Sequence, residues 1–225
     1  MRKLGCLVVL CLMLVVAEVG CNSGDQNGDG METGVSALVA LTDAHISGYM
    51  GLLVTLAATA EVRSGDWDEM SMLLTRAAAN QVPALVWFVS PDGWYYAVNE
   101  GFTGKNLSDR AYFAPLMAGK RVLGDLVVSK ATGNPSVIVA APVYVDNTVI
   151  GGLGASIFLD DLSEIVADAL SLPENYVFSV ATDQDQVALH SNPALILGDQ
   201  PQIPRDAVLA TSELTGWHFA LAFEK

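Results

Sequence analysis

An arginine and two aromatic residues that follow one another closely, Arg110, Tyr112 and Phe113, are the residues of this sequence best suited to chemistry. They lie in the segment NLSDRAYFAPLMAGKRV, residues 106–122. A planar guanidinium binds a carboxylate through two parallel hydrogen bonds, and flanking aromatic rings exclude water and strengthen the pair. One interpretation is therefore that this segment forms a wall of a pocket for a small anionic ligand.

A second interpretation of the same segment is purely structural. Ser108 is a good helix N-cap and Asp109 is favourable in a first helical turn, so the two residues could simply start a helix. Arg110 would then pair with Asp109 or with another nearby carboxylate. The sequence alone leaves both interpretations open.

Further candidate side chains lie on segments predicted to be strands. Trp87, Tyr95 and Tyr96 come from a predicted hairpin in which successive residues face opposite sides. One side of this hairpin should line the pocket and the other should pack on helices, but the sequence does not say which. Ser129 and Lys130 end the third predicted strand, where they are candidates for the pocket, although Lys130 also suits a solvated sheet edge.

No group of residues predicts catalysis or metal binding. His45, His190 and His218 are far apart in the sequence, and none has the spacing of a metal-binding motif. The sequence contains no nucleophile elbow, phosphate-binding loop or Cys-x-x-Cys pair. The glycines at 151–154 fall within a predicted strand, where they permit a neighbour to pack closely. We therefore expect no enzymatic activity, no metal and no cofactor.

The N-terminus predicts export. Residues 1–20 have a basic start and an apolar run at 4–17, which is too short to span a bilayer and is typical of a signal peptide. Cys21 then resembles the lipidated cysteine of a bacterial lipoprotein, although Glu18 stands where an aliphatic residue is usual. We expect an extracytoplasmic lipoprotein, in the periplasm or at the cell surface, with a flexible linker at 21–32. An uncleaved membrane anchor and ordinary secretion are the alternatives.

Composition narrows the range of partners. The chain has 225 residues, of which 52% are hydrophobic, enough for a packed core, and its formal net charge is -14. Nucleic acid is disfavoured as a partner because phosphate contacts need clustered lysine and arginine. Docking on anionic lipids through a basic face is disfavoured for the same reason, so we expect membrane attachment through the lipid anchor.

Apolar periodicity predicts an α+β chain. Helical spacing predicts a long amphipathic helix over 33–62, and a second helix follows SGDWDEM and ends by Pro83. The period then becomes that of strands, with a helix inserted between the second and the third. The five predicted strands cover residues 84–90, 94–99, 122–129, 136–145 and 148–159. Another helix is predicted at 160–171.

The chain divides into a main domain at 33–172 and a smaller part at 173–225. The smaller part contains a hairpin, a proline-rich loop and two final strands, and forms either a shortened second lobe or an extension of the first sheet. The long N-terminal helix offers a surface for a homodimer, since Gly48 and Gly51 either weaken it or let another backbone approach closely.

The order of four segments resembles a Cache domain, the extracytoplasmic PAS-like sensor module. These segments are FVSPDGWYYAV, GKNLSDRAYF, ATGNPSVIVAAPV and VIGGLGASIFLDDL. The resemblance covers roughly residues 35–190, and residues 174–225 resemble a shortened second lobe of the double form. It implies a five-stranded antiparallel PAS-like sheet beside a long N-terminal helix, with the ligand between the sheet and the inserted helix.

The resemblance also implies roles for individual residues. Many double Cache domains that bind amino acids have an arginine, one spacer and two aromatic residues, a pattern that Arg110, Tyr112 and Phe113 match. Arg110 would take the ligand carboxylate. The same pattern requires an aspartate for the ligand ammonium where this chain has Ser156. A simple carboxylate or another small metabolite is therefore expected in place of an α-amino acid.

Three functional hypotheses remain. The first is a lipid-anchored sensor that binds a small molecule and passes its state to a membrane signalling partner. The second is a structural or interaction lipoprotein with a vestigial pocket, acting through its helix face. An exported enzyme is the third and has the least support, because no nucleophile, base and orienting residue can be assembled from the sequence.

Overall fold

The computed structural model describes residues 26–173 and 175–223, so the predicted signal peptide and Cys21 lie outside the described residues. The helices are α1 (Gln26–Ala57), α2 (Ala60–Arg63), α3 (Trp67–Ala78), α4 (Phe113–Met117), α5 (Leu159–Leu170) and the 3-10 turn η1 (Pro193–Leu195). The strands are β1 (Ala84–Val89), β2 (Trp94–Ala97), β3 (Gly101–Asn106), β4 (Val122–Val128), β5 (Pro135–Val145), β6 (Thr148–Phe158), β7 (Tyr176–Ala181), β8 (Val187–His190), β9 (Val208–Thr211) and β10 (His218–Phe223).

The first sheet is antiparallel and has six strands in the order β3-β2-β1-β6-β5-β4. Five of them are the predicted ones, and the prediction of a five-stranded sheet was wrong by one edge strand, β3. Its sequence, GFTGKN, contains two glycines and lacks a run of β-branched residues, so it gives no strand signal. Its pairing with β2 nevertheless brings Asn106 to the edge of the candidate site.

Helix α1 differs from its prediction at both ends. It begins at Gln26, so residues 26–32, which we expected to belong to a flexible linker, form its first turns. Met31 is buried there, with 4% of its surface exposed, and packing at this position offsets the low helix propensity of the preceding polar, glycine-rich residues. The helix ends at Ala57, before the predicted end at residue 62. A short separate helix, α2, follows, and the Thr59 side chain caps its start by accepting a hydrogen bond from the Val62 amide.

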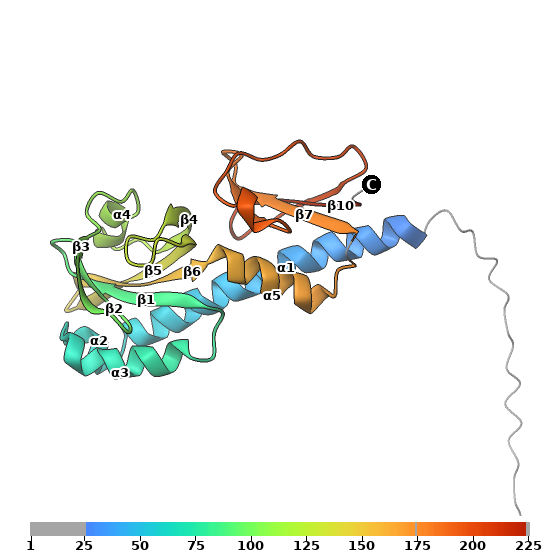
Figure 1. Ribbon diagram of the computed structural model, residues 1–225. Coiled ribbons are helices and arrows are strands. Elements are labelled where there is room, and N and C mark those ends of the chain that lie inside the picture. Colours follow the sequence, from blue (N-terminus) through green and yellow to red (C-terminus); the bar gives the residue numbers. More distant parts are fainter. Residues whose placement is uncertain (1–25, 174, 224–225) are drawn as a thin grey trace, which may run out of the picture.

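The C-terminal part forms a separate lobe with its own antiparallel sheet, in the order β8-β7-β10-β9. Helix α1 runs alongside both sheets and contacts β5 of the first and β9 and β10 of the second (Figure 1). The contact is close, since a Cβ added at Gly34 of α1 would lie 2.9 Å from Cδ2 of Leu221 in β10. One apolar core therefore extends along α1 through both lobes.

The segment Gly30–Ala57 of α1 is long and apolar enough to cross a membrane by length and composition. In this structure, however, its inward-facing side chains are fully buried against protein, including Leu38, Ile46 and Leu53. Tyr49, also buried, donates a hydrogen bond of 2.7 Å to the Val82 carbonyl, two residues before β1. Here α1 packs as the central core helix of the two lobes.

A buried hydroxyl joins α1 to the second lobe, and we expect Ser212→Ala to destabilise the protein. The Ser212 hydroxyl donates to the Asp43 carboxylate (2.8 Å) and accepts from the Leu214 and Thr215 amides (both 3.0 Å). Its removal leaves these groups without a partner, at a cost of about 2 kcal/mol and a fall in Tm of roughly 4–8 °C. Thermal unfolding of the variant measures the effect.

Ser47→Ala is the matched control, because this α1 hydroxyl is exposed and makes only a 3.3 Å bond to the Ala44 carbonyl. Its Tm should stay within about 1 °C of the parent. Equal losses in the two variants would contradict the role given to Ser212.

Candidate ligand-binding site

The first sheet is covered on both faces, and successive residues of β1 point to opposite ones. Val86 and Phe88 belong to the core that the sheet shares with α1. Leu85 and Trp87 belong to a second apolar cluster, on the face covered by α4 and the segment before it. This strict alternation follows from the two-residue period of a strand. The candidate site lies on the α4 side.

The structure also decides which side of the hairpin lines the site. Tyr95 lies on the α4 side with Trp87. Tyr96 lies on the other face and stacks on Trp67 of α3, with 5.4 Å between ring centroids. The Trp87 indole is fixed because its Nε1 donates a 3.1 Å hydrogen bond to the Ser156 hydroxyl on β6.

Three small residues let the sheet accept these large side chains. A Cβ at Gly154 would lie 2.2 Å from the Trp87 ring, and one at Gly152 would lie 2.4 Å from Leu116 of α4. On the other face, a Cβ at Gly151 would lie 2.6 Å from the Phe88 ring. The prediction that these glycines permit close packing is therefore confirmed.

A tight turn before α4 positions Arg110. The Arg110 amide donates to the Leu107 carbonyl (2.9 Å), and the Arg110 carbonyl accepts from the Phe113 amide (3.0 Å). One terminal nitrogen of the guanidinium, Nη2, donates 2.8 Å to the carbonyl of Val128 at the end of β4. The Nε atom is buried and has no hydrogen-bond partner among the described residues. Such a donor is costly to bury alone, so it favours a ligand that accepts a hydrogen bond.

The purely structural interpretation of this segment was wrong in its details. Helix α4 begins at Phe113, and no side chain caps it, so Ser108 is not its N-cap. Instead, the Ser108 amide donates 2.8 Å to the Asn106 side chain. Asp109 pairs with Lys130 at 2.6 Å and not with Arg110. Within the described residues the guanidinium of Arg110 has no carboxylate partner.

The segment and the sheet enclose a small cavity. Its lining includes six of the seven residues proposed from the sequence, namely Trp87, Tyr95, Arg110, Tyr112, Ser129 and Ser156. Phe113 is buried beside the cavity in the apolar cluster and does not line it. The cavity volume is about 10 Å³, and a single water needs roughly 10–15 Å³ by the same measure. A ligand therefore enters only if the walls move.

Two loops are tied together at the mouth of this cavity. Lys130, which lines the cavity, donates to Asp109 (2.6 Å) and to the Asn106 carbonyl (2.8 Å). Lys105 donates in turn to the carbonyls of Lys130 and Ala131, the second at 3.3 Å. We call these contacts the mouth bridge. They hold the loop before α4 against the loop after β4.

Charges and hydroxyls in the site suit an anion. Burial raises the pKa of the Tyr112 phenol well above its ordinary value, and the nearby Arg110 charge opposes this shift only in part. Burial also raises the pKa of Tyr95. Both phenols therefore stay protonated at neutral pH and can donate hydrogen bonds. At the mouth, the hydrogen bond from Lys130 holds the pKa of Asp109 below its usual range.

Asp125 of β4 is a carboxylate beside the candidate site that we did not predict from the sequence. Asp125 lies opposite Ile138 in the sheet, and Ile138 lines the cavity, as does Val127 two residues farther along β4. Burial raises the pKa of Asp125, and no ion pair holds it within the described residues. The sequence does contain a signal for this position, because Asp125, Val127 and Ser129 are two residues apart along one strand and therefore share a face. Asp160, in the first turn of α5, lines a different hollow.

The raised pKa of Asp125 leads to a prediction about stability and pH. A carboxyl whose pKa is higher in the folded state than in the unfolded state is destabilising once pH exceeds its unfolded value. We therefore expect Asp125→Asn to raise Tm at pH 7. The gain should vanish as pH falls below about 3, where the wild-type carboxyl is protonated in both states. Thermal unfolding of both proteins between pH 3 and pH 7 tests this.

Asp183→Asn is the matched control, since Asp183 is an exposed aspartate in the β7–β8 turn and loses the same charge. A gain of similar size in this control would show that relief of the overall negative charge, and not the burial of Asp125, causes the effect.

Sequence comparisons identify no relatives: no known family profile matches the chain, and no curated protein matches it. Solved structures do match over most of its length. The ligand-binding domain of the Pseudomonas fluorescens chemoreceptor CtaA in complex with L-valine has a TM-score of 0.71 at 14% identity, covering 89% of this chain and 99% of that one. The ligand-binding domain of the Pseudomonas aeruginosa chemoreceptor PctB in complex with L-Arg has a TM-score of 0.68 at 15% identity, covering 88% and 87%.

The sensor domain of the V. cholerae histidine kinase DctB is similar as well, with a TM-score of 0.64 at 14% identity, covering 89% of this chain and 96% of that one. The fold is therefore that of the ligand-binding domains of chemoreceptors and sensor kinases. More particularly, it is the Cache-type sensor fold, as the sequence predicted. At these identities the likeness concerns the fold, so the function has to be argued from the site.

Proposed function

We propose that this chain is an extracytoplasmic sensor domain that binds a small carboxylate at Arg110 and passes its state to a partner. The observation that carries the proposal is the guanidinium itself. It faces a cavity walled by Trp87, Tyr95 and Tyr112, and its Nε is buried without an acceptor among the described residues. A bound carboxylate would supply that acceptor in a site from which the rings exclude water.

The site offers weaker partners for an ammonium group of a ligand than for its carboxylate. Similar solved domains hold L-valine and L-Arg. In this chain Ser156 stands where the Cache pattern has an aspartate, and its hydroxyl already accepts from Trp87. The two hydroxyls of Ser129 and Ser156 bind an ammonium more weakly than a carboxylate does. Simple carboxylates are therefore the expected class, with α-amino acids binding less tightly.

The same proposal includes a lipid anchor that attaches the chain to a membrane and a partner that receives its signal. Cys21 would carry lipid at the outer surface of a membrane, and the chain would act on a membrane signalling protein or as a homodimer through α1. Intact mass spectrometry of the chain purified from bacterial membranes tests the first point. Cleavage before Cys21 with the added mass of acyl chains is expected, and an unmodified Cys21 would refute the anchor.

A thermal-shift screen of the purified full-length chain tests ligand binding. The compounds are lactate, pyruvate, succinate and benzoate, with α-amino acids, alkylamines and purines as comparison classes. At a concentration of 100 times Kd, binding stabilises the folded state by about 2.7 kcal/mol, which is roughly 5–10 °C for a chain of this size. The best ligand should carry a carboxylate. A purine or an amine as best ligand would contradict the proposal.

One observation favours the alternative of a structural or interaction lipoprotein with a vestigial pocket. The cavity of about 10 Å³ is too small for any metabolite as it stands. In that case no compound raises Tm, and Arg110→Ala changes nothing except stability. Saturable binding of any carboxylate, lost in Arg110→Ala, excludes this alternative.

A further inference from the structure

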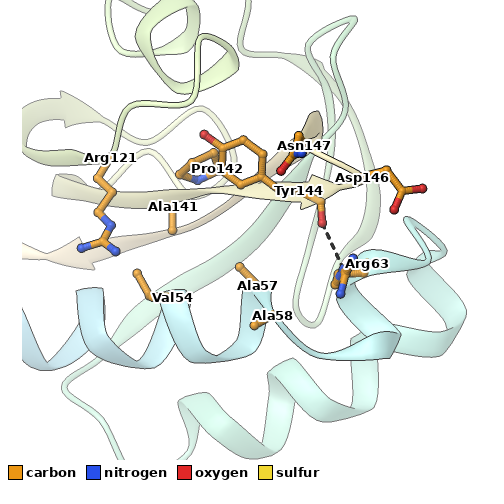
Figure 2. A pocket seen from close by; sticks show the side chains of 10 residues that line it. All are labelled: Val54, Ala57, Ala58, Arg63, Arg121, Ala141, Pro142, Tyr144, Asp146 and Asn147. Carbon is orange, nitrogen blue, oxygen red and sulfur yellow. Dashed lines mark hydrogen bonds between the residues drawn. The ribbon is translucent and has the colours of Figure 1, made fainter.

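A groove much larger than the Arg110 cavity lies on the opposite face of the first sheet. Its volume is about 560 Å³, and it runs between the C-terminal end of α1 and strand β5 (Figure 2). Ala141, in its wall, belongs to the core on the α1 side, whereas its neighbour Ala140 belongs to the cluster under α4. The groove is therefore separated from the Arg110 cavity by the full thickness of the sheet. In volume it suits a small organic molecule.

Two arginines line this groove at opposite ends, Arg63 of α2 and Arg121 immediately before β4 (Figure 2). The Arg63 Nε donates 3.0 Å to the Tyr144 carbonyl, which holds its guanidinium in place. Its terminal nitrogens form no hydrogen bond within the described residues and can donate to a ligand. Tyr144 is itself anchored, because its hydroxyl donates 3.1 Å to the Gly119 carbonyl. Arg121 is exposed and has no carboxylate partner within the described residues.

The two arginines make this groove positively charged, whereas the chain as a whole has a formal net charge of -14. Asp146 also lines the groove, but it forms no ion pair with Arg63 or Arg121 within the described residues. Between the two guanidiniums the walls include small apolar side chains, among them Val54, Ala57 and Ala141. A charged group at each end and an apolar middle match an elongated molecule that is anionic at both ends.

We propose that this groove is a second ligand site, which takes a small organic dianion such as an aliphatic dicarboxylate. One carboxylate pairs with Arg63 and the other with Arg121, because each guanidinium offers two parallel donors. The methylene chain lies over the alanines, where its burial removes apolar surface from water. The site is independent of the Arg110 cavity and of the function proposed for it.

Isothermal titration calorimetry of the full-length chain at low ionic strength tests this site. The probes are glutarate, adipate and suberate, with dimethyl glutarate as the uncharged comparison. We expect saturable binding of at least one dicarboxylate at concentrations up to a few millimolar and none of the diester. Arg121→Gln should weaken that binding about 10-fold or more, since it removes one charge-assisted pair. Because Arg121 is exposed, its replacement should leave Tm unchanged.

Two arginine variants outside the groove show whether the dicarboxylate binds there and nowhere else. Arg76→Gln removes an exposed charge on α3, away from the groove, and should leave the affinity for the dicarboxylate within about twofold. Arg110→Gln removes the guanidinium of the other cavity, and dicarboxylate binding that is lost in Arg121→Gln should persist in it. Absence of saturable binding by every probe overturns the proposal. Loss of binding in Arg110→Gln but not in Arg121→Gln also overturns it, as does equal weakening by Arg76→Gln and Arg121→Gln.

Discussion

Arg110→Gln is expected to lower the affinity for the carboxylate that the thermal-shift screen identifies by about 100-fold or more. Removing one partner of a buried charge pair costs roughly 2–5 kcal/mol, and each 1.4 kcal/mol is tenfold in Kd. The unliganded protein should change little, because two effects oppose each other. The variant loses the hydrogen bond to the Val128 carbonyl and also loses a buried Nε that has no partner among the described residues. Calorimetric titration and Tm without ligand measure the two quantities.

Two further variants make this result specific. Arg110→Lys keeps the charge and loses the planar pair of donors, so its affinity should fall between those of the parent and Arg110→Gln. Arg76→Gln, which removes an exposed arginine from α3, should bind like the parent. If Arg110→Gln retains the parent affinity while Tm is unchanged, the carboxylate does not bind at this guanidinium.

Gly154→Ala should cause a larger loss of stability than any other substitution proposed for this chain. The new methyl group would lie 2.2 Å from the Trp87 ring, which is 2% exposed and held by its hydrogen bond to Ser156. The indole has to leave its position, and for so close a contact with a fixed ring we expect the upper end of the usual cost of overpacking, about 3 kcal/mol. A fall in Tm of roughly 5–10 °C follows, together with a change in near-ultraviolet circular dichroism as the indole moves.

Gly48→Ala is the matched control for this substitution. Gly48 is an exposed residue of α1, and nothing lies within 4 Å of the Cβ that would be added. Alanine in the middle of a helix is favoured over glycine by about 0.5–1 kcal/mol, so Tm should rise slightly. A fall in Tm at Gly48 similar to that at Gly154 would point to a general cost of replacing glycine, and not to the contact with Trp87.

Most of the element order was predictable because each element carries its own period. Runs such as ALVWFV and SVIVAAPV show the β-branched and aromatic composition of buried strands. Two features carried no such signal. The first turns of α1 read as a polar, glycine-rich tether, and their helix depends on tertiary packing at Met31. Strand β3 depends on pairing with β2, which a short segment does not reveal by itself.

The candidate site was only partly predictable, and the reason lies in how its residues come together. Trp87, Tyr95 and Arg110 were found because each belongs to a recognisable local pattern. That Phe113 does not line the cavity depends on where α4 begins, and the sequence suggested an earlier start at Ser108. Arg63 and Arg121 line the same groove because α2 packs against β5. Because the two arginines are far apart in the sequence, no local sequence pattern predicts that they share a groove.

The mouth bridge has a consequence for timing. If these contacts span the entry to the cavity, a molecule bound at Arg110 enters or leaves only when Lys130 releases Asp109 and the Asn106 carbonyl. Uptake should therefore reach a ceiling set by this opening step, however abundant the compound becomes. Departure should be gated by the same step. A chain with the proposed sensor function would then average over brief fluctuations in its surroundings and respond to the sustained level.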